Sequence, residues 1–214
     1  MDEVRNIAII ADGEFPQSEY PRYLISSADA VVCCDGALVK YLNFSDGKHP
    51  AAVVGDMDTL SEDLKAEFAD IIVKYDEQDY DDLAKAMRYS LGEYPFLERI
   101  SIFGASGGQE DFTIGNYGLL MEFARNHPDV TFEMISDHTS AFALNDSDTF
   151  DCGTGRTISV FSSDPSLRIA SKGLEWPLDE VCFDNWWKGI RNRATEDRIA
   201  LKFNHPAPVL IILN

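Results

Sequence analysis

The sequence has few basic residues and no long apolar run. Its 214 residues include 18 lysines and arginines against 37 aspartates and glutamates, which gives a formal net charge of −19. Such a surplus of negative charge opposes binding to a phosphate backbone, and no basic stretch offsets it, so we expect no nucleic-acid partner. Apolar runs stay well below the ~20 residues that cross a bilayer, so we expect no membrane partner.

Cysteine is scarce, and its spacing is not typical of a zinc site. Two of the four cysteines, Cys33 and Cys34, are neighbours inside an apolar run, as expected for small buried hydrophobic residues. We therefore expect no disulfides. The N-terminus carries Asp2 and Glu3 where a signal peptide has basic residues, and the apolar segment that follows is short. These features predict a cytoplasmic protein.

Strand-like and helix-like segments alternate through the first two thirds of the chain. Helical patterns with an apolar stripe occupy residues 81–91 and 114–123. Alternation of strands and helices is typical of a parallel sheet that is flanked by helices. The segments expected to form strands are residues 7–10, 30–34, 53–54, 71–73, 100–103 and 131–135.

The pattern changes after a turn-rich segment at residues 145–148. Short alternating segments follow, which is typical of antiparallel structure, and neither a repeat nor a low-complexity tract is present. The sequence thus predicts an α/β domain, residues 1–145, with an open, mostly parallel sheet, and then an antiparallel β-sandwich-like domain, residues 146–214. Strands are expected in the second domain at residues 157–161, 167–170, 199–203 and 209–213.

Two carboxylates one residue apart, Asp56 and Asp58, follow the apolar residues 51–54. An open α/β sheet binds its ligands at the carboxyl ends of its strands. Alternate residues of an extended segment point the same way, so both carboxylates could face one Mg²⁺ ion. The alternative is an acidic turn before a helix that begins near Ser61.

Two further acidic sites follow predicted strands. Asp35 precedes Gly36, whose missing side chain permits close approach of a ligand, although Asp35 could instead cap a helix. Asp79 and Asp82 could face a metal ion from the same side as the other carboxylates. The alternative is that they lie at a helix start, where carboxylates are favoured anyway.

A glycine-rich segment at residues 104–111 follows the strand expected at residues 100–103 and ends in Asp111. Its backbone amides could bind phosphate, or the glycines could serve only a tight strand-to-helix connection. In a parallel sheet this segment and the acidic sites converge on one edge.

In combination these segments resemble the thiamin pyrophosphokinase family over nearly the whole chain. The family's D-G-G-A, G-D-F-D-S, Q-D-x-T-D and G-G-R-x-D motifs are matched in order, and the later G-L-x-W/Y-x-L element has a similar counterpart. Five motifs in sequence order carry the resemblance, whereas no single one would. The matching residues are 35–37, 55–59, 78–82, 107–111 and 173–178.

The resemblance implies transfer of a pyrophosphate group from ATP to thiamin, with Mg²⁺ held by Asp56, Asp58 and Asp82. Asp79 and Asp111 would be further catalytic candidates, as acceptors of the thiamin hydroxyl proton or ligands of a second metal ion. The residues expected to contact ATP are Asp35, Gly36, Gln78, Asp81, Gly107, Gly108 and Gln109.

For thiamin, the resemblance implies contacts with Trp176, Arg191 and Asn192. The tryptophan ring suits a cationic thiazolium or a pyrimidine ring, and its alternative is packing in the core. The family works as a homodimer in which thiamin lies between the β domain of one subunit and the acidic site of the other. We therefore expect ATP, thiamin and a second copy of this chain as partners.

Several residues depart from the family's motifs. Gln109 stands where the family has arginine, and Phe112 stands where histidine is frequent, so a charge-assisted phosphate contact is missing. Asp81 replaces threonine and adds negative charge, and Arg191 lies where the family has serine hydroxyls. These changes leave open a different mode of ATP binding, an altered acceptor or a weakened enzyme.

Two other functions stay open at this level. One is a metal-dependent phosphate-ester hydrolase with the same acidic cluster, although no lysine at a strand end is evident for it. The other is a non-catalytic module that binds thiamin or a nucleotide, which the departures make credible.

Overall fold

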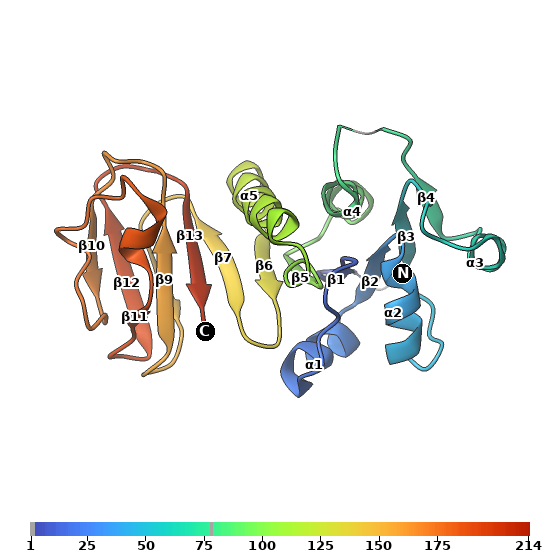
Figure 1. Cartoon of the computed structure of the whole chain (residues 1–214), viewed down its shortest axis with the longest axis horizontal. Coiled ribbons are helices and arrows are strands. Elements are labelled where there is room, and N and C mark those ends of the chain that lie inside the picture. Colours follow the sequence, from blue (N-terminus) through green and yellow to red (C-terminus); the bar gives the residue numbers. More distant parts are fainter. Residues whose placement is uncertain (1–2, 78) are drawn as a thin grey trace. The chain divides into compact units, whose positions relative to one another are not determined.

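The computed structural model describes residues 3–77 and 79–214, so Gln78, expected to contact ATP, lies outside the described residues. The chain forms two compact units, one of Met1–Leu119 with Asp129–Asp137 and the other of Leu120–Pro128 with His138–Asn214. Figure 1 labels most elements of both units. The single domain boundary expected after residue 145 stays a prediction.

The first unit contains a parallel sheet in the order β6-β5-β1-β2-β3-β4. Strand β1 lies between β2 and β5, so the strand order reverses beside it, and a crevice forms there at the carboxyl ends of the strands. The six strands are β1 (Asn6–Ile10), β2 (Ala30–Cys34), β3 (Ala52–Gly55), β4 (Ile72–Lys74), β5 (Arg99–Phe103) and β6 (Thr131–Ile135).

Central strands of this sheet are buried on both faces, which explains their continuous apolar sequence. On one face, Ala8, Val31 and Val53 pack with residues of the first two helices, such as Ile25 and Leu38. On the other face, the helix α4 contacts β1, β2 and β3. The helices are α1 (Glu19–Ser27), α2 (Ala37–Phe44), α3 (Glu62–Glu67), α4 (Asp82–Glu93) and α5 (Glu110–Asn126).

Local capping decides where two of these helices begin. Ser61 accepts a hydrogen bond from the amide of Leu64 and begins α3, the helix expected near that residue. Asp81 accepts a hydrogen bond from the amide of Ala84 at 2.8 Å and begins α4. Helix α5 begins at Glu110, earlier than expected, because its polar first turn was interpreted as part of the glycine-rich connection.

The second unit contains two antiparallel sheets, in the orders β11-β9-β13-β7 and β10-β12-β8. A short 3-10 helix, η1 (Trp186–Gly189), precedes β11. The strands are β7 (Ser140–Leu144), β8 (Asp148–Asp151), β9 (Thr157–Phe161), β10 (Ile169–Lys172), β11 (Asn192–Arg193), β12 (Arg198–Phe203) and β13 (Val209–Leu213).

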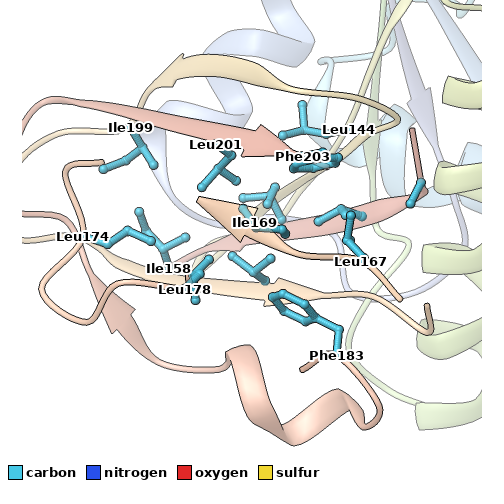
Figure 2. Packing of buried hydrophobic residues seen from close by; sticks show 14 of the residues in the cluster. Leu144, Ile158, Leu167, Ile169, Leu174, Leu178, Phe183, Ile199, Leu201 and Phe203 are labelled. Carbon is cyan, nitrogen blue, oxygen red and sulfur yellow. The ribbon is translucent and has the colours of Figure 1, made fainter. Parts of the chain in front are cut away.

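Alternate residues of both sheets form one hydrophobic core. Figure 2 shows Ile158 of one sheet with Ile169, Ile199 and Leu201 of the other. The positions that face this core are apolar, as expected for packed antiparallel sheets, and in the sheet β10-β12-β8 they alternate with outward residues such as Arg198 and Lys202. The predicted fold class, an α/β part followed by a sandwich-like antiparallel part, is confirmed.

Three strands of the second unit were not predicted: β7, β8 and the two-residue strand β11. Strand β7 pairs with β13, although its residues were assigned to the first domain. Strand β8 begins inside the segment interpreted as a turn, at residues 145–148, and pairs with β12. Its apolar signal is weak because Phe150 is the one large side chain that it contributes to the core.

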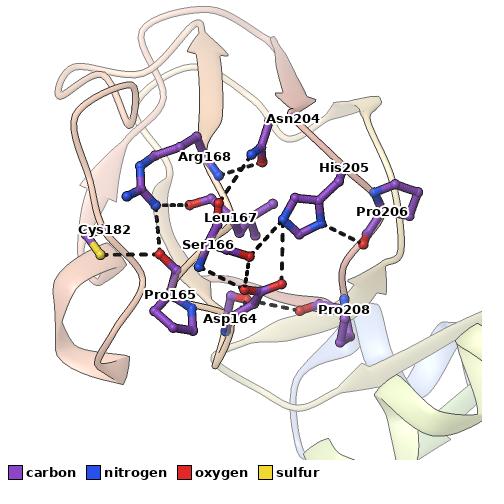
Figure 3. Close-up of polar contacts among 11 residues, drawn as sticks. Asp164, Pro165, Ser166, Leu167, Arg168, Cys182, Asn204, His205, Pro206 and Pro208 are labelled. Atoms are coloured by element: carbon purple, nitrogen blue, oxygen red, sulfur yellow. Dashed lines mark hydrogen bonds and ion pairs between the residues drawn. The ribbon is translucent and has the colours of Figure 1, made fainter.

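Polar contacts fix the loops after β9 and β12 (Figure 3). Ser166 Oγ donates to Asp164 Oδ1 at 2.6 Å and lies 3.1 Å from His205 Nε2. The other ring nitrogen of His205 faces the carbonyl oxygen of Pro206 at 3.1 Å. Because Ser166 Oγ donates its hydrogen bond to the carboxylate of Asp164, these side chains hold the loops and do not form a nucleophilic triad.

The four cysteines, all within the described residues, are free thiols, as expected. Across residues 3–77 and 79–214, no helix combines the length and apolar character that crossing a membrane requires.

Candidate functional site

A cavity of about 530 Å³ lies at the carboxyl edge of the parallel sheet in the first unit. Its wall is formed by the segments that follow β1, β2, β3 and β5 and by the first turns of α4 and α5. The convergence expected from the sequence is therefore present for most segments. Among the residues to which the sequence analysis assigns roles, those that line the cavity are Asp35, Gly36, Asp56, Asp81, Asp82, Gly107, Gly108 and Gln109.

Three aspartates of this edge converge. Carboxylate oxygens of Asp35, Asp56 and Asp58 all lie within 4.8 Å of one another. The side chain of Asp35 is 3% exposed, its Oδ1 has no hydrogen-bond partner among the described residues, and its Oδ2 accepts only a long bond of 3.4 Å from the amide of Thr59. A buried carboxylate with an unpaired oxygen is unfavourable unless a cation compensates it.

Asp56 and Asp58 meet through a turn and not through an extended strand end. Met57 between them has a φ of 66°, in the left-handed region, and the amide of Asp58 donates to Asp56 Oδ1 at 3.2 Å. The expectation that alternate residues of an extended segment bring them together was wrong, because β3 already ends at Gly55. The nearby charge of Asp56 raises the pKa of Asp58, as two adjacent carboxylates require.

Asp82, the third metal ligand expected from the resemblance, is close to the same group. A Cβ atom on Gly55 would lie 3.0 Å from Asp35 Cβ and 3.2 Å from Asp82 Oδ2. The side chains of Asp35 and Asp82 therefore both lie next to this glycine. Asp82 Oδ1 lies 3.0 Å from Lys85 Nζ. Burial raises the pKa of Asp82, and the ammonium group of Lys85 opposes that shift.

The role of Asp35 as a helix cap is not supported. Helix α2 begins at Ala37, and Gly36 occupies the N-cap position without a side-chain hydrogen bond. A Cβ on Gly36 would lie 2.9 Å from both Asp12 Oδ2 and Thr59 Oγ1. A larger residue at this position would displace these two side chains, so glycine permits their close approach.

Asp81 has a structural role that the sequence did not suggest. It lines the cavity, and its carboxylate caps α4 through the amide of Ala84. Threonine, found at this place in the family's motif, is also an N-cap residue, so both residue types suit the start of the helix.

Asp79 and Asp111 are not brought into the cavity wall. Both residues are exposed, and Asp111 Oδ1 accepts a hydrogen bond from the amide of Phe112 at 3.0 Å. Phe112 itself lines the cavity. The catalytic roles expected for the two aspartates stay predictions.

Further residues of the cavity were missed in the sequence. Asp12 follows β1 just as Asp35 follows β2, so the rule that found one could have found the other. Lys40 Nζ lies 2.7 Å from Asp12 Oδ1. Asn116 is buried and donates to the carbonyl oxygen of Ala105 at 2.8 Å, which fixes the segment before the glycines.

The residues expected to contact thiamin lie in the second unit. The Trp176 side chain is 54% exposed, which excludes the core-packing alternative. Asn192 is buried and bonds to the backbone of Trp176. Arg191 is exposed, has a left-handed φ of 57°, and its amide donates to Ser159 Oγ at 3.1 Å.

Comparisons with known proteins address the same two regions. A family model described as thiamin pyrophosphokinase, catalytic domain, matches residues 21–132, and one described as thiamin pyrophosphokinase, substrate-binding domain, matches residues 141–209. A curated relative, thiamine pyrophosphokinase 1 of Oryza sativa subsp. japonica, is 27% identical over 146 residues, which cover 62% of this chain and 54% of the relative. The chain thus spans about half the length of that relative.

Solved structures share the fold. Thiamine pyrophosphokinase from Bacillus subtilis matches with a TM-score of 0.80 and 20% identity over 98% of this chain and 99% of that chain. Thiamin pyrophosphokinase from Candida albicans matches with a TM-score of 0.76 and 18% identity over 98% of this chain and 88% of that chain. At these identities the similarity establishes the architecture alone.

Proposed function

Because this chain belongs to the thiamin pyrophosphokinase family, we propose that it transfers a pyrophosphate group from ATP to thiamin in a Mg²⁺-dependent reaction, giving thiamin diphosphate and AMP. One observation carries the proposal. A single cavity is lined by the glycines Gly107 and Gly108 and lies beside the convergent carboxylates of Asp35, Asp56 and Asp58. This combination suits a polyphosphate that binds together with a divalent cation.

The carboxylates fit a hard cation. Mg²⁺ takes oxygen ligands, and the unpaired, buried oxygen of Asp35 is of the kind that a cation would compensate. Asp35, Asp56 and Asp58 would hold the ion, and Asp82 offers its second oxygen from beside Gly55. When bound, the ion neutralises phosphate charge during the transfer.

The side chains of the cavity would mainly bind and orient the substrates. In phosphoryl transfer, positioning and electrostatics dominate, because the protein has little covalent chemistry to perform. The thiamin hydroxyl would attack the β-phosphorus of ATP in line with the leaving AMP. Backbone at Gly107 and Gly108 would face the phosphates, and Asp79 and Asp111 stay candidates for accepting the hydroxyl proton.

For the acceptor, we propose that Trp176 stacks on thiamin and that the active protein is a cytoplasmic homodimer with its sites at the subunit interface. The exposed indole ring supports this role, since a flat aromatic face attracts a cationic ring. Trp186, Trp187 and Ile190 of the same unit are exposed as well. Exposed apolar groups of this kind are typical of surfaces that bind a partner or ligand.

The test is an incubation of the purified protein with thiamin, ATP and Mg²⁺, followed by chromatographic separation of the products. Thiamin diphosphate and AMP in equal amounts are expected, and Asp58→Asn serves as the matched inactive variant. Release of inorganic phosphate without thiamin diphosphate would favour the hydrolase. Binding of both substrates without any product would favour a non-catalytic module.

A further inference from the structure

Lys85 is the only lysine or arginine that lines the cavity in the part of the chain that the structure describes. It lies in the first turns of α4, between the buried residues Ala84 and Ala86, and its side chain is 3% exposed. A charged side chain is rarely this deeply buried without a partner. The partner here is Asp82, whose Oδ1 lies 3.0 Å from Lys85 Nζ.

One partner leaves the ammonium group incompletely bonded. An ammonium group has three N–H donors. The described residues provide a single acceptor for Lys85 Nζ, the Asp82 carboxylate. Burying unmatched donors of a charged group is unfavourable, so a further acceptor in the cavity would stabilise this arrangement.

The charges around the cavity indicate the chemistry of that acceptor. The wall carries five carboxylates and one ammonium group, and Gln109 adds no charge. Among the described side chains that line the cavity, the ammonium group of Lys85 is the one cation that a polyphosphate would meet. Lysine binds phosphate as a point charge through charge-assisted hydrogen bonds. The carboxylates that line the wall are Asp12, Asp35, Asp56, Asp81 and Asp82.

We propose that Lys85 binds the polyphosphate chain of the nucleotide and that Asp82 positions its ammonium group. The proposal rests on the proposed function in one respect, that the cavity takes a polyphosphate. It assigns to a residue of α4 the cationic contact that is missing at Gln109. Asp82 is then a counter-ion of the nucleotide-binding lysine as well as a neighbour of the three convergent aspartates.

The test measures binding of inorganic tripolyphosphate by titration calorimetry in the presence of Mg²⁺. Lys85→Met, which keeps the length of the side chain and removes its charge, should weaken binding by at least about tenfold. Lys85→Arg should keep most of the affinity. Lys65→Met is the matched control, because Lys65 forms an ion pair with Glu62 at the same i,i+3 spacing on α3 and lies outside the cavity wall.

A second variant separates ligand binding from a purely structural ion pair. Lys85→Met leaves the carboxylate of Asp82 without its partner, so the melting temperature is expected to fall. Asp82→Asn/Lys85→Met removes both charges and should recover the melting temperature but not the affinity for tripolyphosphate. Recovery of both, or wild-type affinity in folded Lys85→Met, would overturn the proposal.

The same measurements distinguish this inference from the proposed function. Wild-type protein that binds tripolyphosphate through Lys85 but forms no thiamin diphosphate would refute the activity and support the lysine contact. Wild-type protein that forms thiamin diphosphate, together with unchanged tripolyphosphate binding in Lys85→Met, would refute the lysine contact alone.

Discussion

The Asn192 side chain binds the backbone of Trp176 with both ends of its amide. Its Oδ1 accepts from Trp176 N at 3.2 Å, and its Nδ2 donates to Trp176 O at 2.6 Å. Asn192 is only 5% exposed, so its side-chain amide bonds to the protein backbone and does not face solvent. The resemblance implied a direct contact with thiamin, but this geometry supports a role in positioning Trp176.

Asn192→Ala should therefore weaken thiamin binding by displacing Trp176. Loss of buried hydrogen bonds of this kind costs about 1–3 kcal/mol, so KM for thiamin should rise more than kcat falls. Quenching of tryptophan fluorescence by thiamin measures the change, with Trp176→Ala as the reference. Wild-type affinity in Asn192→Ala would contradict the positioning role.

Asp58→Asn should have opposite effects on activity and on stability. It removes a proposed metal ligand, so turnover should be abolished. Without divalent cations it should raise the melting temperature, because the charge of Asp56 disfavours ionised Asp58. The raised pKa means that this repulsion appears as pH rises through the range in which carboxylates ionise.

Thermal melts in the presence of a chelator and then of Mg²⁺ check this prediction. Wild-type protein should gain stability with Mg²⁺, and Asp58→Asn should gain little. Asp63→Asn, an exposed aspartate in the first turn of α3, is the control. Equal gains in melting temperature with Mg²⁺ in all three proteins would contradict the assignment of Asp58 as a metal ligand.

Gln109→Arg should tighten ATP binding by adding a charge-assisted contact in the cavity. The difference between a charged and a neutral hydrogen bond is about 1 kcal/mol, or roughly fivefold in affinity. Asp81→Thr should act in the same direction and keep the start of α4, because threonine also caps helices. Calorimetric titration with ATP checks both, and Gln17→Arg controls for added charge away from the site.

Unchanged ATP affinity in Gln109→Arg, in Asp81→Thr and in their combination would contradict the placement of phosphate beside Gly107 and Gly108. The nucleotide would then lie against another part of the wall.

Asp164→Asn should reduce stability near neutral pH but not in strong acid. Hydrogen bonds from Ser166 hold the pKa of Asp164 below its usual value. Because the pKa of Asp164 is lower in the folded state, its ionised carboxylate stabilises the protein at pH values above the unfolded-state pKa of about 4. This stabilisation is lost as the pH falls through the folded-state pKa. The difference in melting temperature between wild type and variant should therefore shrink below about pH 4.

Melts recorded from about pH 7 to about pH 2 measure that difference. Glu180→Gln, a change at an exposed acid of the same unit, is the control. A difference between wild type and Asp164→Asn that stays constant over this range would show that the carboxylate charge contributes nothing through Ser166.

Much of the fold was predictable because burial leaves a clear pattern. Strands β2, β6, β9 and β13 were predicted with their observed bounds, since each is a short apolar or alternating run. Strand β8 was missed because polar residues surround its one core side chain, so its pairing with β12 depends on residues far along the chain. Such pairing leaves no local signal.

The part of the candidate site that was predictable from the sequence consists of residues that directly follow strands of the parallel sheet. Asp35, Asp56 and the glycine segment converge as the parallel sheet requires. Lys85 was missed because a lysine inside an apolar helical stretch gives no signal by itself, and its burial depends on the packing of α4 against the sheet. The turn at Met57 depends on a backbone conformation that residue type alone does not indicate.

The division of the chain into two units also limits how it can be cut. The chain passes from one unit to the other after residues 119, 128 and 137. Any single cut of the chain therefore divides the sequence of at least one unit between the two fragments. A fragment that ends at residue 119 would lack β6, the partner of β5 in the parallel sheet. Separate production of a nucleotide-binding half and a thiamin-binding half would therefore require redesign of the connections, since truncation cannot yield both.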